Sequence, residues 1–177
     1  ASFGRGFFVL DDYSALREFT EDNLSQKGKL FTPREAKWFV PRSNIGNTGA
    51  DYYFADNPKY GAVFTYHLAD DYKTAKDIRR DKEAELNKRN ADIPFPGWEK
   101  LDKEREEEPA SIVLTIQDNQ GNVINKISKR ASDGSHRIAW DFSHFNPYPV
   151  TSESSNYNRS GALAKPGTYN ASLALIK

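Results

Sequence analysis

Hydrophobic and polar residues alternate along several short stretches of the chain. In the stretch Gly61–Leu68, one face would carry Ala62, Phe64, Tyr66 and Leu68, and the other face Val63, Thr65 and His67. This period of two predicts a strand with one face on a core. The same pattern predicts four more strands, at Ser111–Asp118, Val123–Lys129, Arg137–Phe142 and Thr168–Ile176.

Turn residues separate these predicted strands. Asp118–Asn122 predicts a hairpin turn, and Asp133-Gly134 and Pro166-Gly167 predict two further turns. Short antiparallel strands of this kind are typical of an immunoglobulin-like β-sandwich, which usually has about seven strands. Five are recognisable after residue 60, so one or two more should come from residues 20–60, from residues 144–165, or from the glycine-punctuated stretch Phe3–Leu10.

Residues 70–108 have a different character, because they are dense in Lys, Arg, Asp and Glu. Good helix formers dominate Asp70–Asn90, where Ala75, Ile78 and Leu86 mark a narrow apolar stripe. Prolines and Gly97 then interrupt the pattern, and Glu99–Glu108 predicts a second short helix that ends at Pro109. We therefore expect a charged helical insertion between two strands. Its cost in loop-closure entropy is only about 2 kcal/mol.

The expected organisation is mainly β, with three parts. Residues 1–20 hold a strand and a short helix or turn, in which Asp11, Asp12 and Ser14 are turn or cap residues. Residues 21–60 are rich in Asn, Gly, Asp and Pro and predict a long surface connection, pinned by aromatic side chains such as Phe31 and Trp38. Residues 61–177 form the sandwich with its insertion at 70–108.

Composition narrows the functional classes. The chain has 177 residues, 37% of them hydrophobic and 28% charged, with a formal net charge of zero, so no global charge attracts nucleic acid. It has no cysteine, which excludes disulfides, thiolate metal sites and a cysteine nucleophile. No apolar run approaches the roughly 20 residues that span a bilayer. The first residue is Ala1 rather than Met, and we expect the sequence to begin inside a longer protein.

Catalytic and metal-binding patterns are weak, and we predict no catalytic residue, metal or cofactor. Asp11 and Asp12 would point to opposite faces of a strand, so the pair suits a turn better than glycoside hydrolysis. The spacing of the three histidines, at positions 67, 136 and 144, fits neither a metal site nor a Ser-His-Asp triad.

Surface aromatics are the candidate ligand-binding residues. Trp140 falls in register with Ile138 and is expected in the core. Trp98 follows Pro-Phe-Pro-Gly in the polar insertion, where it either packs the insertion onto the sandwich or contacts a partner. The other candidates are Trp38, Tyr52 and Tyr53, which either contact a ligand or dock the long connection on the sandwich.

An ordered set of short motifs resembles one family. The motifs are Ser2–Arg17, Pro58–Ala62, Pro94–Trp98, Arg137–Asp141 and Pro166–Tyr169. Together they resemble the C-terminal region of bacterial BNR-repeat, sortilin-like β-propeller proteins labelled glycosyl hydrolases, in which a propeller-closing strand precedes an immunoglobulin-like domain. The Asp-box of the propeller blades, roughly Ser-x-Asp-x-Gly-x-x-Trp, is missing from this sequence.

The resemblance implies a non-catalytic accessory or assembly domain of a secreted propeller protein. Its implied partner is the upstream propeller, and its implied location is periplasmic or secreted. A carbohydrate-binding module that uses the surface aromatics is the first alternative, and an enzyme with an unfamiliar site is the second. The stretch Phe3–Leu10 would normally complete a propeller blade, so self-association through this strand is a further expectation.

Overall fold

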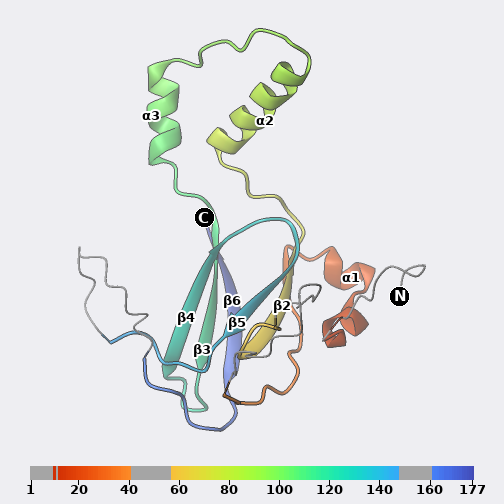
Figure 1. Cartoon of the computed structure of the whole chain (residues 1–177), viewed down its shortest axis with the longest axis vertical. Coiled ribbons are helices and arrows are strands. Elements are labelled where there is room, and N and C mark those ends of the chain that lie inside the picture. The colour runs from red at the N-terminus through yellow and green to blue at the C-terminus, as the bar shows by residue number, and fades with distance from the viewer. Residues whose placement is uncertain (1–9, 11, 41–56, 148–160) are drawn as a thin grey trace, which may run out of the picture.

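The computed structural model of this chain describes residue 10 and residues 12–40, 57–147 and 161–177. Its elements, in chain order, are a 3₁₀ helix Ser14–Glu18, α1 Glu21–Leu24, β1 Gly28–Leu30, β2 Ala62–Leu68, α2 Ala75–Lys88, α3 Trp98–Glu106, β3 Ser111–Gln117, β4 Val123–Arg130, β5 Gly134–Trp140 and β6 Asn170–Ile176. The fold is mainly β, with two three-stranded antiparallel sheets in the orders β1-β2-β5 and β4-β3-β6. Helices α2 and α3 extend away from both sheets (Figure 1).

Both sheets contribute to one apolar cluster, and the alternation of the strands predicts its members in β2, β3 and β5 correctly. The first sheet supplies Phe64, Tyr66, Leu68, Ile138 and Trp140, and the second supplies Ile112, Leu114, Ile116 and Ile124. The three β3 side chains have no exposed surface at all, because β3 is the middle strand of its sheet. Burying such aliphatic side chains contributes about 1.5–3 kcal/mol each.

The connection between β3 and β4 is the turn that the sequence predicts. One carboxylate oxygen of Asp118 accepts hydrogen bonds from the backbone N–H groups of Gln120 and Asn122, both at 2.9 Å. Gly121 has φ of 85°, a conformation that glycine adopts without steric cost. The turn therefore fixes the register in which β3 and β4 pair.

The segment 21–60 contributes one of the further strands that were expected. Within the expected surface connection, Gly28–Leu30 forms β1 and pairs with β2, and the following Phe31 is buried against Phe19. Alternation could not locate this strand, because three residues are too few for a period of two to be visible. Residues 41–56 of this segment lie outside the described residues.

Smaller differences concern the ends of elements. The last strand starts at Asn170 rather than at Thr168, and β5 runs Gly134–Trp140 rather than Arg137–Phe142. Phe142 lies beyond the strand because its φ is 65°, which an extended strand cannot accommodate. Of the expected strand Phe3–Leu10, the structure describes only Leu10, which is exposed.

Gly61 provides a test of how tightly the start of β2 is packed. Its φ is 110°, and a Cβ atom there would lie 2.0 Å from the carbonyl oxygen of Trp140. We expect Gly61→Ala to lower the free energy of unfolding by about 3 kcal/mol or more, since backbone strain and a backbone clash add together. Chemical denaturation followed by tryptophan fluorescence measures the change.

The matched control is Gly121→Ala. Gly121 also has a positive φ, but a Cβ atom there meets nothing within 4 Å. Only the conformational cost remains, so we expect a loss of about 1 kcal/mol. Equal losses for the two variants would contradict the close approach of Gly61 to Trp140.

Candidate functional site

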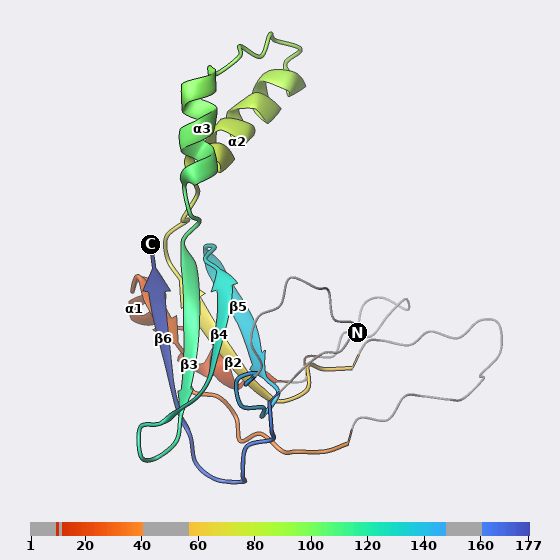
Figure 2. The ribbon, with the colours of Figure 1, turned by 90° about the vertical axis from the view of Figure 1, so that its left-hand side faces the viewer.

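The insertion between β2 and β3 forms a helical arm, defined here as residues 75–106. Two views at right angles show α2 leading away from the sheets and α3 returning toward them, with the connection 89–97 at the far end (Figures 1 and 2). Charged helices at 70–108 were therefore predicted correctly, and the structure places them at 75–88 and 98–106. The connection and the start of α3 are the part of the arm farthest from the core.

Local sequence signals set the ends of the arm helices. Thr74 caps α2: its hydroxyl oxygen accepts the backbone N–H of Asp77 at 3.2 Å, and the Asp77 carboxylate accepts the backbone N–H of Thr74 at 3.0 Å. Helix α2 ends before Asn90, whose φ of 51° is left-handed. Helix α3 starts after Gly97, with a φ of 90°, and ends before Pro109.

An ion pair joins the two arm helices. The Nε atom of Arg79 donates to both carboxylate oxygens of Glu104 at 2.9 Å, and its Nη2 atom lies 2.8 Å from Oε2. A second carboxylate, Glu83, accepts from the same guanidinium at 2.6 Å. Glu104 is 6% exposed and is the one buried residue that either helix contributes. The hydrogen bonds from Arg79 hold the pKa of the Glu104 carboxyl below its usual value.

The expected apolar stripe of α2 is mostly exposed. Of its three residues, Ile78 is 45% exposed, Ala75 is exposed and Leu86 is half-buried. Hydrophobic periodicity could not reveal the Arg79–Glu104 pair, because its partners lie 25 residues apart and on different helices. An ion pair thus joins the two helices, and neither helix contributes a buried apolar side chain.

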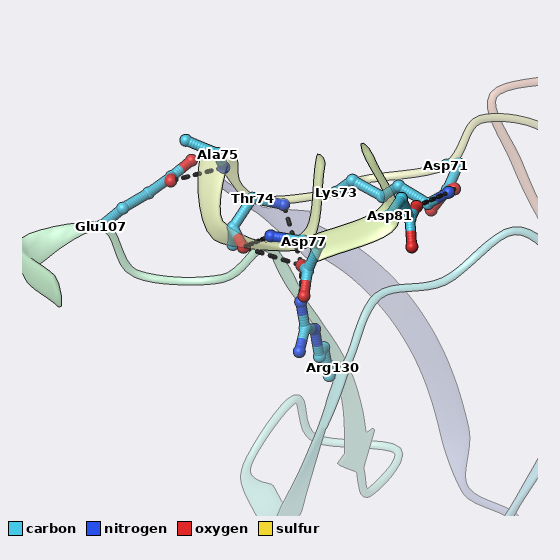
Figure 3. A network of polar contacts seen from close by, with 8 residues as sticks. All are labelled: Asp71, Lys73, Thr74, Ala75, Asp77, Asp81, Glu107 and Arg130. Carbon is cyan, nitrogen blue, oxygen red and sulfur yellow. Dashed lines mark hydrogen bonds and ion pairs between the residues drawn. The ribbon is translucent and has the colours of Figure 1, made fainter. Parts of the chain in front are cut away.

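A second set of polar contacts lies at the base of the arm, and one of them, Arg130 with Asp77, reaches the sheets. We call this set the joint: Thr74, Ala75, Asp77, Glu107 and Arg130 (Figure 3). The Arg130 guanidinium, at the end of β4, pairs with the Asp77 carboxylate, and the backbone N–H of Ala75 donates to Glu107 Oε2 at 2.7 Å. Hydrogen bonds from Thr74, together with the charge of Arg130, lower the pKa of Asp77.

Beside the joint lies a cavity of about 380 Å³. Its charged lining balances, with Asp71, Asp77 and Asp81 against Lys73, Arg80 and Arg130. Lys73 is within 2.8 Å of Asp81 and 3.2 Å of Asp71, and these carboxylates raise its pKa (Figure 3). Since most of these charges are already paired with each other, the cavity serves the attachment of the arm better than the capture of a charged ligand.

The far end of the arm carries an aromatic tip, which we define as Ile93, Phe95 and Trp98. Trp98 is 71% exposed and Phe95 is 61% exposed, and their ring centroids are 5.0 Å apart with an interplanar angle of 67°. Exposed large apolar side chains that gather in one place are typical of an interaction surface. The sequence left two expectations for Trp98: packing onto the sandwich, or contact with a partner. Its exposure is not compatible with packing onto the sheets. Sequence reasoning missed Phe95, although its i,i+3 spacing from Trp98 was a usable signal.

The other aromatic candidates do not join this tip. Trp38 is 60% exposed and lies on the connection that follows β1, outside the arm. Tyr52 and Tyr53 fall outside the described residues. Trp140 is a core residue, as predicted, and its indole N–H donates to the carbonyl of Ser143 at 2.8 Å.

The residues considered for catalysis have structural contacts. Asp12 forms an Asx turn, because its carboxylate accepts the backbone N–H of Ser14 at 2.9 Å. This confirms the prediction that Asp12 is a turn residue. Asp11 lies outside the described residues. His67 Nε2 donates to the carbonyl of Leu24, so its Nδ1 atom accepts from the Ser135 hydroxyl, 3.1 Å away. This Ser–His pair sits on the outer face of β2 and β5 and ties α1 to the sheet.

In the part of the chain that the structure describes, no group of three or more His, Asp or Glu side chains is arranged to hold a metal ion. None of its helices is long and apolar enough to cross a membrane. Comparison with protein-family models, with curated proteins and with solved structures gave no match. The function is therefore proposed from the geometry of the chain itself.

The ion pair within the arm can be tested by Glu104→Gln. Removing the carboxylate leaves the Arg79 guanidinium partly uncompensated, so we expect the helical circular-dichroism signal at 222 nm to be lost at a lower temperature. The control is Asp102→Asn, because the Asp102–Arg105 pair is exposed and longer, at 3.4 Å. If both variants lose the helical signal at the same temperature as the wild type, the role of Glu104 would be contradicted.

The same pair predicts a dependence on pH. The pKa of Glu104 is lowered in the folded chain, so its contribution is fully present above the ordinary carboxyl pKa and is lost as the pH falls through the lowered value. We expect the helical signal of the wild type to weaken in acid below about pH 4, and to weaken less in Glu104→Gln. Identical acid titrations of the two proteins would contradict this assignment.

The joint can be tested with two spin labels. The sequence has no cysteine, so Asn87→Cys on the arm and Lys126→Cys on β4 give two unique labelling sites. Electron double resonance should then show a broader distance distribution when Arg130→Ala is added, because a contact between arm and sheet is lost. Arg105→Ala, which lies within the arm, should leave the width unchanged. An unchanged width for Arg130→Ala would show that the joint does not orient the arm.

Proposed function

We propose that this chain is a non-catalytic accessory module that binds a partner protein through the aromatic tip of its arm. The observation that carries the proposal is the exposure of Phe95 and Trp98 at the end of an arm whose base is fixed to the sheets. Aromatic side chains contribute most of the energy of many protein interfaces, since they bury a large area at a small entropy cost. Fixing them on an arm reduces that cost further.

The orientation of the two rings favours a protein partner. At 67° to each other, the Phe95 and Trp98 rings form a wedge that fits into a pocket, rather than a coplanar platform. The third member of the tip, Ile93, is aliphatic and 47% exposed, and it extends the apolar area. An apolar wedge is typical of the anchor of a protein interface.

The resemblance of the sequence motifs supports a specific setting for this module. We propose that the two sheets form an immunoglobulin-like sandwich at the C-terminus of a secreted or periplasmic propeller protein. The proposed partner is the propeller of the same polypeptide. The proposal of a sandwich is supported by two antiparallel sheets that share one cluster of buried residues.

One observation favours carbohydrate binding as the second candidate function. Trp98 is 71% exposed, so one of its faces could stack on a sugar ring. Calorimetric titration with soluble polysaccharides separates the two candidates. Saturable heat that Trp98→Ala abolishes would favour carbohydrate, and no heat at millimolar sugar would favour the protein partner. An enzyme with an unfamiliar site is the remaining alternative, and turnover of a glycoside panel by the chain would support it.

The test of the main proposal is a titration of the separately produced upstream region with the 177-residue chain. We expect the double variant Phe95→Ala with Trp98→Ala to raise the Kd by roughly tenfold or more, since anchor residues each contribute over about 1 kcal/mol. Both side chains are exposed, so the stability of the variant should stay within about 0.5 kcal/mol of the wild type.

Trp38→Ala is the matched control, because Trp38 is a similarly exposed tryptophan outside the arm. We expect its Kd to equal that of the wild type. A Kd that is unaffected by the loss of Phe95 and Trp98, or the absence of binding, would contradict the proposed function.

A further inference from the structure

The outer edge of β6 is unpaired among the residues that the structure describes. Strand β6, Asn170–Ile176, pairs with β3 along one edge over all seven residues and is the last strand of its sheet. Its other edge presents backbone N–H and C=O groups in an extended row. Such a row is a template for pairing with another strand.

Strand β6 differs from the other edge strands in having no charge. Each of the three other edges carries at least one cation within its strand: Lys29 in β1, Arg137 in β5, and Lys126, Lys129 and Arg130 in β4. Lysine and arginine on an edge discourage pairing with a second chain. The sequence Asn-Ala-Ser-Leu-Ala-Leu-Ile of β6 has neither a charge nor a proline, so nothing in this strand opposes pairing.

The inner face beside this edge is incompletely covered. Ala171, Leu173 and Leu175 point toward the core but are only half-buried, unlike the fully buried Ile112 and Leu114 of β3. Between the edges β6 and β1 lies a cavity of about 440 Å³, which these residues line together with Gly28, Leu30 and Leu68. An added strand that brings aliphatic side chains to this side would cover the exposed part of the core.

We propose that a second copy of this chain supplies the added strand, with the two β6 strands paired antiparallel about a two-fold axis at Leu173. This register pairs all seven residues and keeps inward-facing residues on one face. It places Leu173 opposite its own copy and Leu175 opposite Ala171, so aliphatic side chains meet on the inner face. On the outer face, Ser172 lies opposite Ala174 of the second copy. The strand is thus complementary to itself, with no like charges opposed.

The arm does not obstruct this pairing. In the β3–β6 ladder Ile176 pairs with Ser111, which follows α3 closely, so the C-terminal end of β6 lies at the base of the arm (Figure 2). Antiparallel pairing of two copies therefore directs their arms to opposite ends of the dimer. Each copy keeps its aromatic tip accessible.

The experiment is the solution mass of the full chain, measured by light scattering over a concentration series. We expect the wild type to change from its monomer mass of 20.1 kDa to twice that mass as the concentration rises. In Ser172→Lys with Ala174→Lys, the proposed register opposes lysines at both pairs. In Ser172→Lys with Ala174→Glu, it opposes lysine and glutamate. We expect the dimer Kd of the first variant to exceed that of the second by about tenfold or more.

The two variants alter the same exposed positions, and melting curves will show whether both fold. A wild type that stays monomeric, or equal Kd values for the two folded variants, would overturn the proposal. Deletion of residues 1–10 distinguishes the other route to self-association. If that deletion abolishes the dimer while the double-lysine variant retains it, the N-terminal stretch is the contact and β6 is not.

Discussion

Burial of the inner face of β3 is the constraint on which the rest of the structure depends. Ile112, Leu114 and Ile116 have no exposed surface, and residues of both sheets pack around them. Strand β3 also pairs with both other strands of its sheet, and it begins shortly after α3 ends. The strand that fills the core is therefore also the strand to which the arm returns. Each proposed surface, the arm and the β6 edge, is positioned by it.

Different interactions stabilise the arm and the sheets. The sheets are held by apolar burial, which does not depend on charge, whereas the arm is held by ion pairs and helix caps. Neither arm helix contributes a buried apolar side chain, so the arm should open more easily than the sheets, and its exposed ion pairs weaken with ionic strength. Such an element can adjust to a partner while the core stays folded. In the proposed function, the ion-paired arm presents the apolar side chains of the aromatic tip to another protein.

Sequence patterns predicted the strands in which apolar and polar residues alternate over several positions. Alternation over seven residues located β2 and β3, and the Asp118–Asn122 turn chemistry located β4, the hairpin partner of β3. A further strand was expected from residues 20–60 or two other stretches, but the three residues of β1 could not be located, because a period of two is not visible in three residues. The arm was predicted from helix propensity, but its attachments were not. Arg79 with Glu104 and Arg130 with Asp77 are ordinary charges among many in the sequence, and only the folded chain brings each pair together. The exposure of Trp98 likewise depends on which way the arm points.

The central claim is that charge holds an arm which the hydrophobic core does not stabilise. Native-state hydrogen exchange tests it most directly, because it gives an opening free energy for each backbone amide. The account predicts that amides of α2 and α3 open together at a free energy well below that of β3, and that added salt lowers the value for the arm alone. Arm amides as protected as those of β3, and equally insensitive to salt, would contradict it.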